Sequence, residues 1–195
     1  MKGTEPVNLY LHVDRSGRLP LGKMIETQLR PGEDGLAGYA AMFAPGFTEH
    51  IKTLCIEGIS AHGIQYLIRF FENETHTPLL FKELFLEFVR WKYAIAEPSR
   101  FQSFFAWGSY TDALSFSKLV SRDNPQRRII EVEPLSQVFK GDMNLTRGFA
   151  KEDLFLAYWN GERLDNTAGY APVWEYVLKP PIRVIREITQ GASVE

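Results

Sequence analysis

Short β-type segments stand near both ends of the chain and enclose a long stretch with helical spacing, and this arrangement limits the fold more than any other feature. Residues 7–13 alternate, are rich in β-formers and end at a turn composition, so they predict a first strand that ends at His12. From about residue 36 to residue 94 the apolar residues instead recur at helical spacing. Strands that flank a helical block favour an α+β fold over a regularly alternating parallel sheet.

The C-terminal half alternates between further strands and one helix. The expected elements are a buried strand over Arg100–Trp107, a helix that begins at Ser109–Asp112, a strand over Arg128–Val132, and two strands over 174–179 and 182–188. Pro180 and Pro181 separate the last two strands. Because proline cannot donate to a strand ladder, this pair predicts a bend or a change of sheet.

Composition predicts one domain over residues 1–195. The chain is 45% hydrophobic with a net charge of -2, which gives no overall field to attract nucleic acid, although a local basic patch remains open. The single cysteine, Cys55, cannot form an internal disulfide, and no histidine or cysteine spacing suggests a metal site. Without an apolar run for a signal peptide or membrane span, we expect a cytoplasmic protein, or an effector delivered without a signal.

Two residues are placed where a side chain can meet a ligand. Glu175 opens an otherwise apolar strand directly after a loop, a common way to present a carboxylate. His12 sits at the end of the first strand. Each also has a plain structural interpretation, as an exposed edge-strand glutamate and as a half-buried, hydrogen-bonded histidine, so neither residue alone assigns a function.

Other polar and aromatic residues leave similar alternatives open. Asp142 lies in a turn after a strand, where it can cap a helix or serve as an acid. Arg100 can bind phosphate with its planar fork or form a surface ion pair. The aromatic residues near it can stack on a planar ring or belong to the core; they are Phe101, Phe104, Phe105, Trp107 and Tyr110. The chain has no glycine-rich phosphate loop and no nucleophile elbow, and Cys55 lies within an apolar helical pattern.

Taken in order along the chain, these segments resemble the motifs of the ADP-ribosyltransferase superfamily. Residues 9–12 look like its first strand, which ends in a histidine that binds the nicotinamide ribose in the diphtheria-toxin-like branch. Gly22 and residues 29–32 are similar to the segment that follows in rifampin ADP-ribosyltransferases. Residues 103–107 resemble the second motif, whose stacking tyrosine is replaced here by Phe105. The substitution keeps a ring face and removes a hydroxyl.

The resemblance offers two candidates for the catalytic acid. Glu175 and the residues after it look like the strand that carries the catalytic glutamate of poly(ADP-ribose) polymerases. Asp142 lies in a segment similar to the third motif of the rifampin-modifying enzymes, which use an aspartate. We favour Glu175, because a strand start fixes a side chain better than a turn does.

The resemblance implies a split antiparallel sheet with a helical insert over about residues 36–94, and transfer of ADP-ribose from NAD with release of nicotinamide. Glu175 would stabilise the cationic sugar, with Asp142 as the alternative acid, and His12 would fix the ribose. The other expected NAD contacts are Arg15 or Arg100 at the pyrophosphate, the Phe105 ring at nicotinamide, Ser103 and Tyr110. The acceptor stays open among a protein, a nucleic acid and a small molecule, and neither a metal nor a membrane is required.

Two further expectations concern geometry. The motif order predicts one groove between the half-sheets, lined by His12, Ser103, Phe105 and Glu175. Helical spacing predicts that the helix over residues 79–94 packs one stripe inward, formed by Leu80, Leu84, Phe88 and Trp91. The alternative to catalysis is an inactive module of the same fold that binds a partner protein through its aromatic insert, or that holds NAD without cleaving it.

Overall fold

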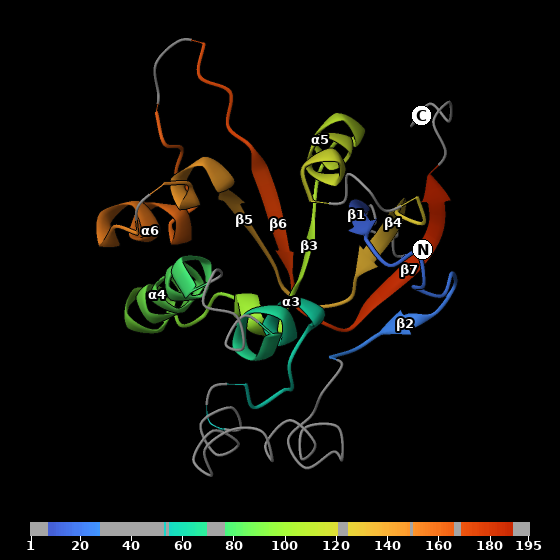
Figure 1. Ribbon diagram of the computed structural model, residues 1–195, viewed down its shortest axis with the longest axis horizontal. Coiled ribbons are helices and arrows are strands. Elements are labelled where there is room, and N and C mark those ends of the chain that lie inside the picture. The colour runs from blue at the N-terminus through green and yellow to red at the C-terminus, as the bar shows by residue number, and fades with distance from the viewer. Residues whose placement is uncertain are drawn as a thin grey trace, which may run out of the picture.

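The computed structural model describes residues 8–27, 53, 55–69, 77–120, 125–148, 150–165 and 169–188 (Figure 1). Every strand pair is antiparallel, and the strands form two sheets. The four-stranded sheet has the order β1 (Tyr10–Asp14), β4 (Arg128–Pro134), β7 (Ile182–Ile188) and β2 (Met24–Ile25). The three-stranded sheet has the order β3 (Phe104–Ala106), β6 (Trp174–Leu178) and β5 (Val138–Asp142).

Among the described residues, one backbone bridge joins the two sheets. An isolated antiparallel bridge joins Leu11 of β1 to Trp107, just after β3, with backbone hydrogen bonds of 2.9 and 2.8 Å. The chain also passes from one sheet to the other at Pro180 and Pro181, because β6 belongs to the three-stranded sheet and β7 to the four-stranded sheet. The predicted change of sheet at the proline pair is thereby confirmed.

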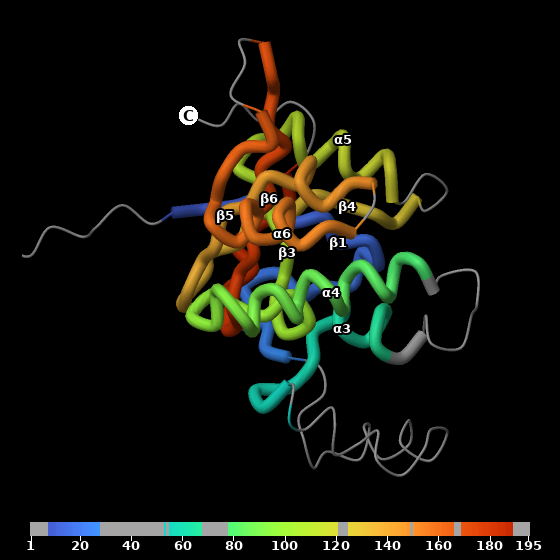
Figure 2. Tube along the Cα trace, turned by 90° about the vertical axis from the view of Figure 1, so that its left-hand side faces the viewer, coloured from blue at the N-terminus to red at the C-terminus, as the bar shows by residue number. Residues whose placement is uncertain are grey.

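The helices cover the sheets unevenly. α4 (Thr77–Tyr93) and α6 (Glu152–Trp159) lie side by side on the outer face of the three-stranded sheet, and α5 (Tyr110–Val120) packs on β1 (Figures 1 and 2). The short elements are α3 (Ala61–Ile64), which continues as the π-helical turn η1 (Gln65–Arg69), and the 3₁₀ turns η3 (Arg100–Gln102) and η4 (Met143–Thr146). The α+β class is confirmed, with helices and antiparallel strands in separate layers.

Three apolar clusters hold these layers together. The first fills the space between the sheets and includes Phe104, Ile130, Leu178 and Val184. The second joins α4 and α6 to β5 and β6, and the third joins α5 to β1. The two faces of β6 serve different clusters, since Val177 packs toward the helices and Leu178 toward the other sheet.

The sequence predicted the start of α5 correctly and the strand before it only in part. The start of α5 is capped by Ser109, whose hydroxyl oxygen accepts from the Asp112 amide at 3.1 Å and donates to the Asp112 carboxylate at 2.6 Å. The strand expected over Arg100–Trp107 is shorter than predicted, because η3 takes its first three residues and only Phe104–Ala106 pair with β6. In this turn the amides of Gln102 and Ser103 bond back to carbonyls three residues earlier, at 3.1 and 3.5 Å.

The predicted inward stripe of α4 is wrong. Leu80 is buried, but Leu84, Phe88 and Trp91 are 38%, 54% and 44% exposed. The buried face carries three charged residues, Glu83, Glu87 and Arg90, together with Leu86 and Val89. Charged side chains are buried here because each has an ionic partner, which hydrophobic periodicity cannot report.

The described part of the insert is helical over α3, η1 and α4. The helical pattern expected across the insert is wrong at residues 55–59, where the Gly58 amide bonds back to the Cys55 carbonyl oxygen in a turn, so Cys55 does not lie in a helix. Residues 29–32, 36–52, 54, 70–76 and 166–168 lie outside the described residues. Within the described part of the chain, no helix is both long and apolar enough to cross a membrane.

Candidate functional site

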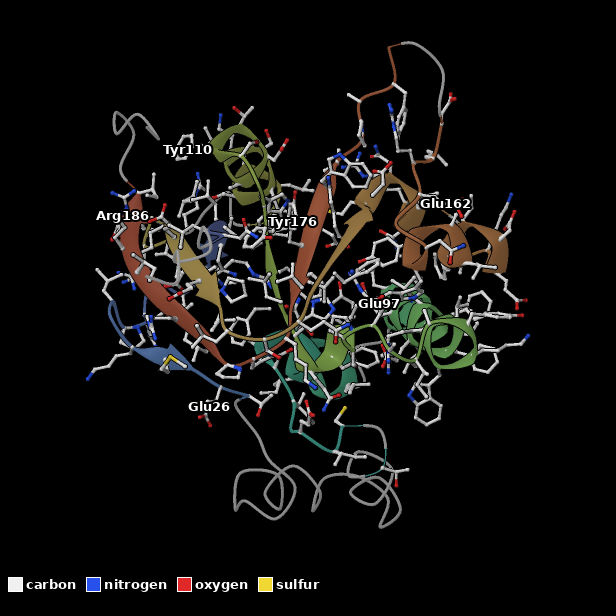
Figure 3. The ribbon with its side chains drawn as sticks, turned by 180° about the vertical axis from the view of Figure 1, so that it is seen from behind. Glu26, Glu97, Tyr110, Glu162, Tyr176 and Arg186 are labelled. Carbon is white, nitrogen blue, oxygen red and sulfur yellow. The ribbon has the colours of Figure 1, made fainter. Side chains whose placement is uncertain are left out.

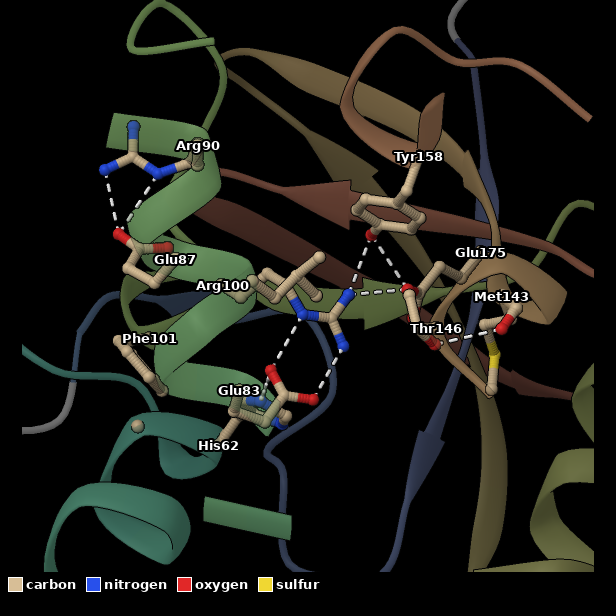
Figure 4. A network of polar contacts seen from close by, with 12 residues as sticks. His62, Glu83, Glu87, Arg90, Arg100, Phe101, Met143, Thr146, Tyr158 and Glu175 are labelled. Carbon is tan, nitrogen blue, oxygen red and sulfur yellow. Dashed lines mark hydrogen bonds and ion pairs between the residues drawn. The ribbon is translucent and has the colours of Figure 1, made fainter. Parts of the chain in front are cut away.

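A buried ionic network lies between α4, α6 and the three-stranded sheet, with Arg100 at its centre (Figure 4). Nη1 of Arg100 donates to Oε1 of Glu175 at 2.5 Å and to the hydroxyl oxygen of Tyr158 at 2.7 Å. The Tyr158 hydroxyl donates in turn to the same Glu175 oxygen at 2.8 Å. Both contacts of the Glu175 carboxylate therefore reach Oε1, and Oε2 has no hydrogen bond among the described contacts.

The other edge of the guanidinium is paired with α4. Nε and Nη2 of Arg100 donate to the two carboxylate oxygens of Glu83 at 2.9 and 3.2 Å, the bidentate geometry that suits arginine. Nε2 of His62, in α3, lies 3.3 Å from Oε2 of Glu83. The chain of contacts thus runs from His62 through Glu83 and Arg100 to Glu175, linking the insert to β6.

A glycine in β5, Gly141, leaves space for the Tyr158 ring beside Glu175. Gly141 of β5 is the cross-strand partner of Glu175, so the two residues share a face of the sheet. A Cβ at Gly141 would lie 2.4 Å from Cε2 of the Tyr158 ring. Only glycine leaves enough space for the ring to pack over β5 and place its hydroxyl on the carboxylate.

Aromatic rings cover the network on the sheet side. The Arg100 guanidinium lies 4.6 Å from the centroid of the Phe105 ring, and the His62 ring lies 4.5 Å from the same ring. Tyr66 packs on His62 with ring centroids 4.5 Å apart. Phe105 is the cross-strand partner of Val177, two residues from Glu175, so Phe105 and Glu175 lie on the same face.

Burial and charge act against each other in this network. Burial by itself would raise the pKa of the Glu83 carboxyl, but the charges of Arg100 and His62 bring that pKa well below its usual range. Burial likewise opposes the charge of Arg100, yet the carboxylates of Glu175 and Glu83 raise its pKa well above its usual range. Burial, helped by the charge of Glu83, raises the pKa of Tyr66 to about 12. With both carboxylates ionised, Glu83, Glu175 and Arg100 together carry one negative charge, which a protonated His62 ring would balance.

His12 is not on the Glu175 face. Its ring lies edge-on to Phe104, with centroids 5.9 Å apart, and its Nδ1 is hydrogen-bonded to the Phe105 carbonyl oxygen at 2.7 Å. Successive strand residues point to opposite faces, so Phe104 lies on the face of β3 opposite to Glu175. Burial lowers the pKa of His12, so the ring is neutral near pH 7. The structure fits the half-buried, hydrogen-bonded histidine that the sequence left open.

Of the other predicted NAD contacts, only Arg15 reaches the network. Nη2 of Arg15 donates to Oε1 of Gln65 at 3.2 Å, next to Tyr66, and burial lowers the pKa of Arg15. Ser103 is buried and lines a different cavity, and Tyr110 packs in the cluster under α5 (Figure 3). The expected common groove is therefore not formed: Phe105 and Glu175 lie together, whereas His12 and Ser103 lie elsewhere.

Asp142 serves as the structural cap that its turn position suggested. It is fully buried, and its carboxylate accepts from the backbone amides of Asn144, Leu164 and Val173 at 3.1, 3.2 and 3.0 Å. It also accepts from the hydroxyl of Tyr170. Four donors occupy the two oxygens, so this carboxylate fixes the entry to β6 and is not placed to meet a ligand.

Sequence reasoning missed four residues of the network, namely His62, Tyr66, Glu83 and Tyr158. His62, Tyr66 and Glu83 lie in stretches with helical spacing, where polar residues ordinarily mark the solvated face. Nothing local links them to Arg100 or Glu175. Among the described residues, no group of three or more histidine, cysteine, aspartate or glutamate side chains is arranged to hold a metal ion.

No curated protein matches the sequence. One family model does match, DUF2441, whose description is a protein of unknown function, and the match covers residues 10–190. That range includes every strand of both sheets and all of the Arg100 network. The chain therefore belongs to the DUF2441 family.

Proposed function

We propose that this protein is an NAD-dependent ADP-ribosyltransferase in which Glu175 is the catalytic acid. The observation that carries the proposal is the meeting of Glu175, Arg100 and Phe105 on one face of the β3–β6 pair. The resemblance named Glu175 as the favoured acid and Phe105 as the nicotinamide platform, in segments 70 residues apart in the chain. It gave Arg100 as one of two arginines for the pyrophosphate, but here Arg100 is paired with Glu83 and Glu175 and instead fixes the Glu175 carboxylate. The fold supports it as well, because two antiparallel sheets that separate at a single bridge form a split sheet.

The charge of the network suits this reaction. Cleavage of the bond between nicotinamide and ribose leaves the bonding electron pair on nicotinamide and positive charge on the sugar, and an acceptor then attacks the sugar and loses a proton. Fixed negative charge stabilises such a transition state, and most effectively where water is excluded. The excess negative charge of Glu83, Arg100 and Glu175, present while the His62 ring is neutral, is of this kind. With Oε1 fixed by Arg100 and Tyr158, Oε2 is the atom that would bind a ribose hydroxyl.

The proposed NAD site around Glu175 and Phe105 is closed to solvent in the structure. Glu175 is 3% exposed, and Arg100 and His62 pack on the Phe105 ring. A nicotinamide ring would have to displace one of these two side chains to stack on Phe105. His62 is held less firmly than Arg100, because its one polar contact among the described residues, to Glu83, adds only to ring packing on Tyr66 and Phe105. NAD binding would therefore be coupled to movement of α3, and His62 rather than His12 is the histidine nearest the bound ring.

The experiment is to incubate the protein with NAD and measure free nicotinamide for the wild type, Glu175→Gln and Asp142→Asn. Loss of a carboxylate that stabilises the transition state should lower turnover about a hundredfold or more. Glu175→Gln should show this loss. Asp142→Asn is the matched control, because it changes a buried acid in the neighbouring strand; it should lower the melting temperature while the folded fraction keeps its activity. No nicotinamide release by the wild type would refute the catalytic proposal.

A second candidate is an interaction module without NAD turnover, and the outer face of α4 favours it. Five large apolar side chains of that helix are 38–64% exposed: Leu79, Phe81, Leu84, Phe88 and Trp91. Exposed apolar patches of this kind commonly mark interaction sites. Under this alternative the Arg100 network only stabilises the fold. Wild-type protein that binds NAD without releasing nicotinamide, or does not bind it at all, would favour this candidate.

A further inference from the structure

The outer face of α4 carries an apolar seam that is open to solvent. Figures 1 and 2 show α4 at the outside of the molecule, with α6 beside it. Four exposed side chains follow one another along the helix at spacings of three, four and three residues, and a fifth lies four residues further on, just after the helix. The seam consists of Phe81, Leu84, Phe88, Trp91 and Ile95, which are 38–73% exposed.

The spacing of the seam suits a helix as its partner. Apolar residues that alternate at intervals of three and four occupy the a and d positions of a coiled coil, where the side chains of one helix insert between those of another. An extended peptide presents its side chains with a period of two and would not match them. The helix is also held in place from its inner side, because Glu83 is paired with Arg100 and the Trp159 indole donates to a backbone carbonyl of α4 at 2.8 Å.

The seam itself contains no charged residue, and the charges of α4 lie to its sides. Three of the five charged residues of the helix are buried, namely Glu83, Glu87 and Arg90. Lys92 is paired with Glu152 of α6 at 3.1 Å. Lys82 follows Phe81 directly and is therefore turned about 100° away from it around the helix. One lysine beside the seam is too little to hold an anionic membrane or a nucleic acid, which several cations ordinarily bind. The occupant that fits is apolar and uncharged where it meets the seam.

A copy of the same seam meets this description in the antiparallel orientation. Two α4 helices related by a twofold axis midway between Leu84 and Phe88 would place Phe81 of one copy against Trp91 of the other, and Leu84 against Phe88. The smaller leucine then packs against a ring, whereas a parallel pair would set each ring against itself. The antiparallel pair also brings opposite ends of the two helix dipoles together.

The exposed area is sufficient for a stable dimer. Phe81, Phe88 and Trp91 are 64%, 54% and 44% exposed, which amounts to about 250–400 Å² for rings that can each bury about 150–250 Å². With Leu84 and Ile95 included, two copies would cover about 700–1,000 Å² of apolar surface. Because about 65% of a homodimer interface is apolar, the whole contact would reach about 1,100–1,500 Å², above the roughly 1,000 Å² that a specific interface requires.

We propose that two copies of this chain associate through α4, with the two seams packed antiparallel. The dimer does not depend on NAD cleavage. It would cover the apolar patch of α4, so that patch would no longer argue for an interaction module in place of an enzyme. The dimer would also brace the helix that carries Glu83, whose carboxylate holds Arg100 in a bidentate pair.

The test is sedimentation equilibrium of the full chain over a range of concentrations. We expect a dimer at about 100 μM, because even the weaker interfaces of this size have micromolar dissociation constants. Phe88→Glu should weaken association about a hundredfold or more, since it places a charge near the centre of the seam in both copies. The matched control is Leu119→Glu, which changes an apolar residue of α5 that is 64% exposed and should leave association unchanged. Circular dichroism checks that both variants are folded.

Cross-linking tests the orientation without a charged substitution. Cys55 is buried, and burial raises the pKa of its thiol to about 12, so an added cysteine is the reactive one. A mixture of Phe81→Cys and Trp91→Cys should form covalent dimers after mild oxidation. Phe81→Cys alone should not, because its two copies would lie about 15 Å apart along the helix axis.

Several results would overturn the proposal. A chain that is monomeric at about 100 μM has no such interface. A dimer that Phe88→Glu leaves intact, or that Leu119→Glu dissociates as well, forms through another surface. Covalent dimers of Phe81→Cys alone would show that the helices pack in parallel. A monomer that sediments with phosphatidylserine vesicles would show that the seam binds a membrane instead of a second copy.

Discussion

Replacement of Arg100 by methionine tests the buried network most sharply. Methionine keeps an unbranched apolar stem against the Phe105 ring but leaves Glu83 and Glu175 without their common cation. The side chains of these acids are 8% and 4% exposed, so water compensates little. Removal of one partner from a buried ion pair costs about 3–5 kcal/mol. For a chain of this length each kcal/mol lowers the melting temperature by about 2–4 °C, which predicts a decrease of about 6–20 °C.

The effect should depend on pH in a defined direction. In the wild type the pKa of Glu83 is below its usual range, because the charges of Arg100 and His62 outweigh its burial. A carboxyl with a lowered pKa adds stability above its unfolded pKa of about 4.3 and loses it as the pH falls. In Arg100→Met the balance shifts toward burial, which favours the protonated form. The variant should therefore be most destabilised near pH 7, and the difference should shrink toward pH 4.

Urea unfolding of the wild type and Arg100→Met at several pH values measures both quantities. The matched control is Arg183→Met, which breaks the pair with Glu133 on the surface, where the arginine side chain is 48% exposed. That change should cost about 0–1 kcal/mol. A loss below about 1 kcal/mol for Arg100→Met, or a loss that stays constant from pH 7 to pH 4, would refute the view that Arg100 compensates two buried carboxylates.

Three further predictions follow from single residues. Gly141→Ala places a Cβ against the Tyr158 ring and should cost about 1–3 kcal/mol in urea unfolding, and an unchanged midpoint would contradict the close packing. Asp142→Ala strands four donors and should lower stability by about 2 kcal/mol or more, with far-ultraviolet circular dichroism as the check that the fold persists. The pKa of His12 is lowered by burial, so wild-type stability should fall as the pH drops below about 6.5, and His12→Gln should remove that part of the slope; an identical slope would count against it.

The elements that the sequence predicted well depend on local chemistry. Alternating β-formers locate β1, and runs of β-formers locate β4, β6 and β7. Pro180 and Pro181 mark the change of sheet because proline acts through its own backbone. The start of α5 follows from Ser109 as its cap. Glu175 could also be identified from the sequence around it, since an acid at the start of an apolar strand is unusual.

The inner face of α4 could not be predicted, because its partners are distant or belong to other elements. Glu83 can be buried because its carboxylate is paired with Arg100, 17 residues later in the chain. Arg90 can be buried because it donates to backbone carbonyl oxygens that follow the helix. When burial is assigned by hydropathy, the apolar stripe of α4 is predicted to face the core and its charged stripe to face solvent. The structure has the opposite orientation. A charged stripe is buried only where its partners are supplied, and a single sequence does not show which ones are.

The candidate site was also predicted only in part, because some of its contacts depend on how distant strands pair. Phe105 and Glu175 lie on one face as the predicted groove required, and Arg100 joins them through ion pairs that the sequence did not predict. The side of β3 on which His12 lies depends on the register between β1 and the end of β3, where Leu11 bridges to Trp107. Since a strand alternates its faces, a shift by one residue would move the His12 ring to the Glu175 face. The sequence can position a histidine at a strand end without assigning it a face.

The most direct test of the central claim is where NAD binds. The chain has four histidines, so the ring signals of His12 and His62 can be assigned in proton–carbon spectra with single-residue variants. Titration with NAD should shift the His62 signals, because that ring lies on Phe105 beside the Glu175 network, and should leave the His12 signals nearly unchanged. Shifts confined to His12, or no shift of either ring at saturating NAD, would contradict a site on the Glu175 face.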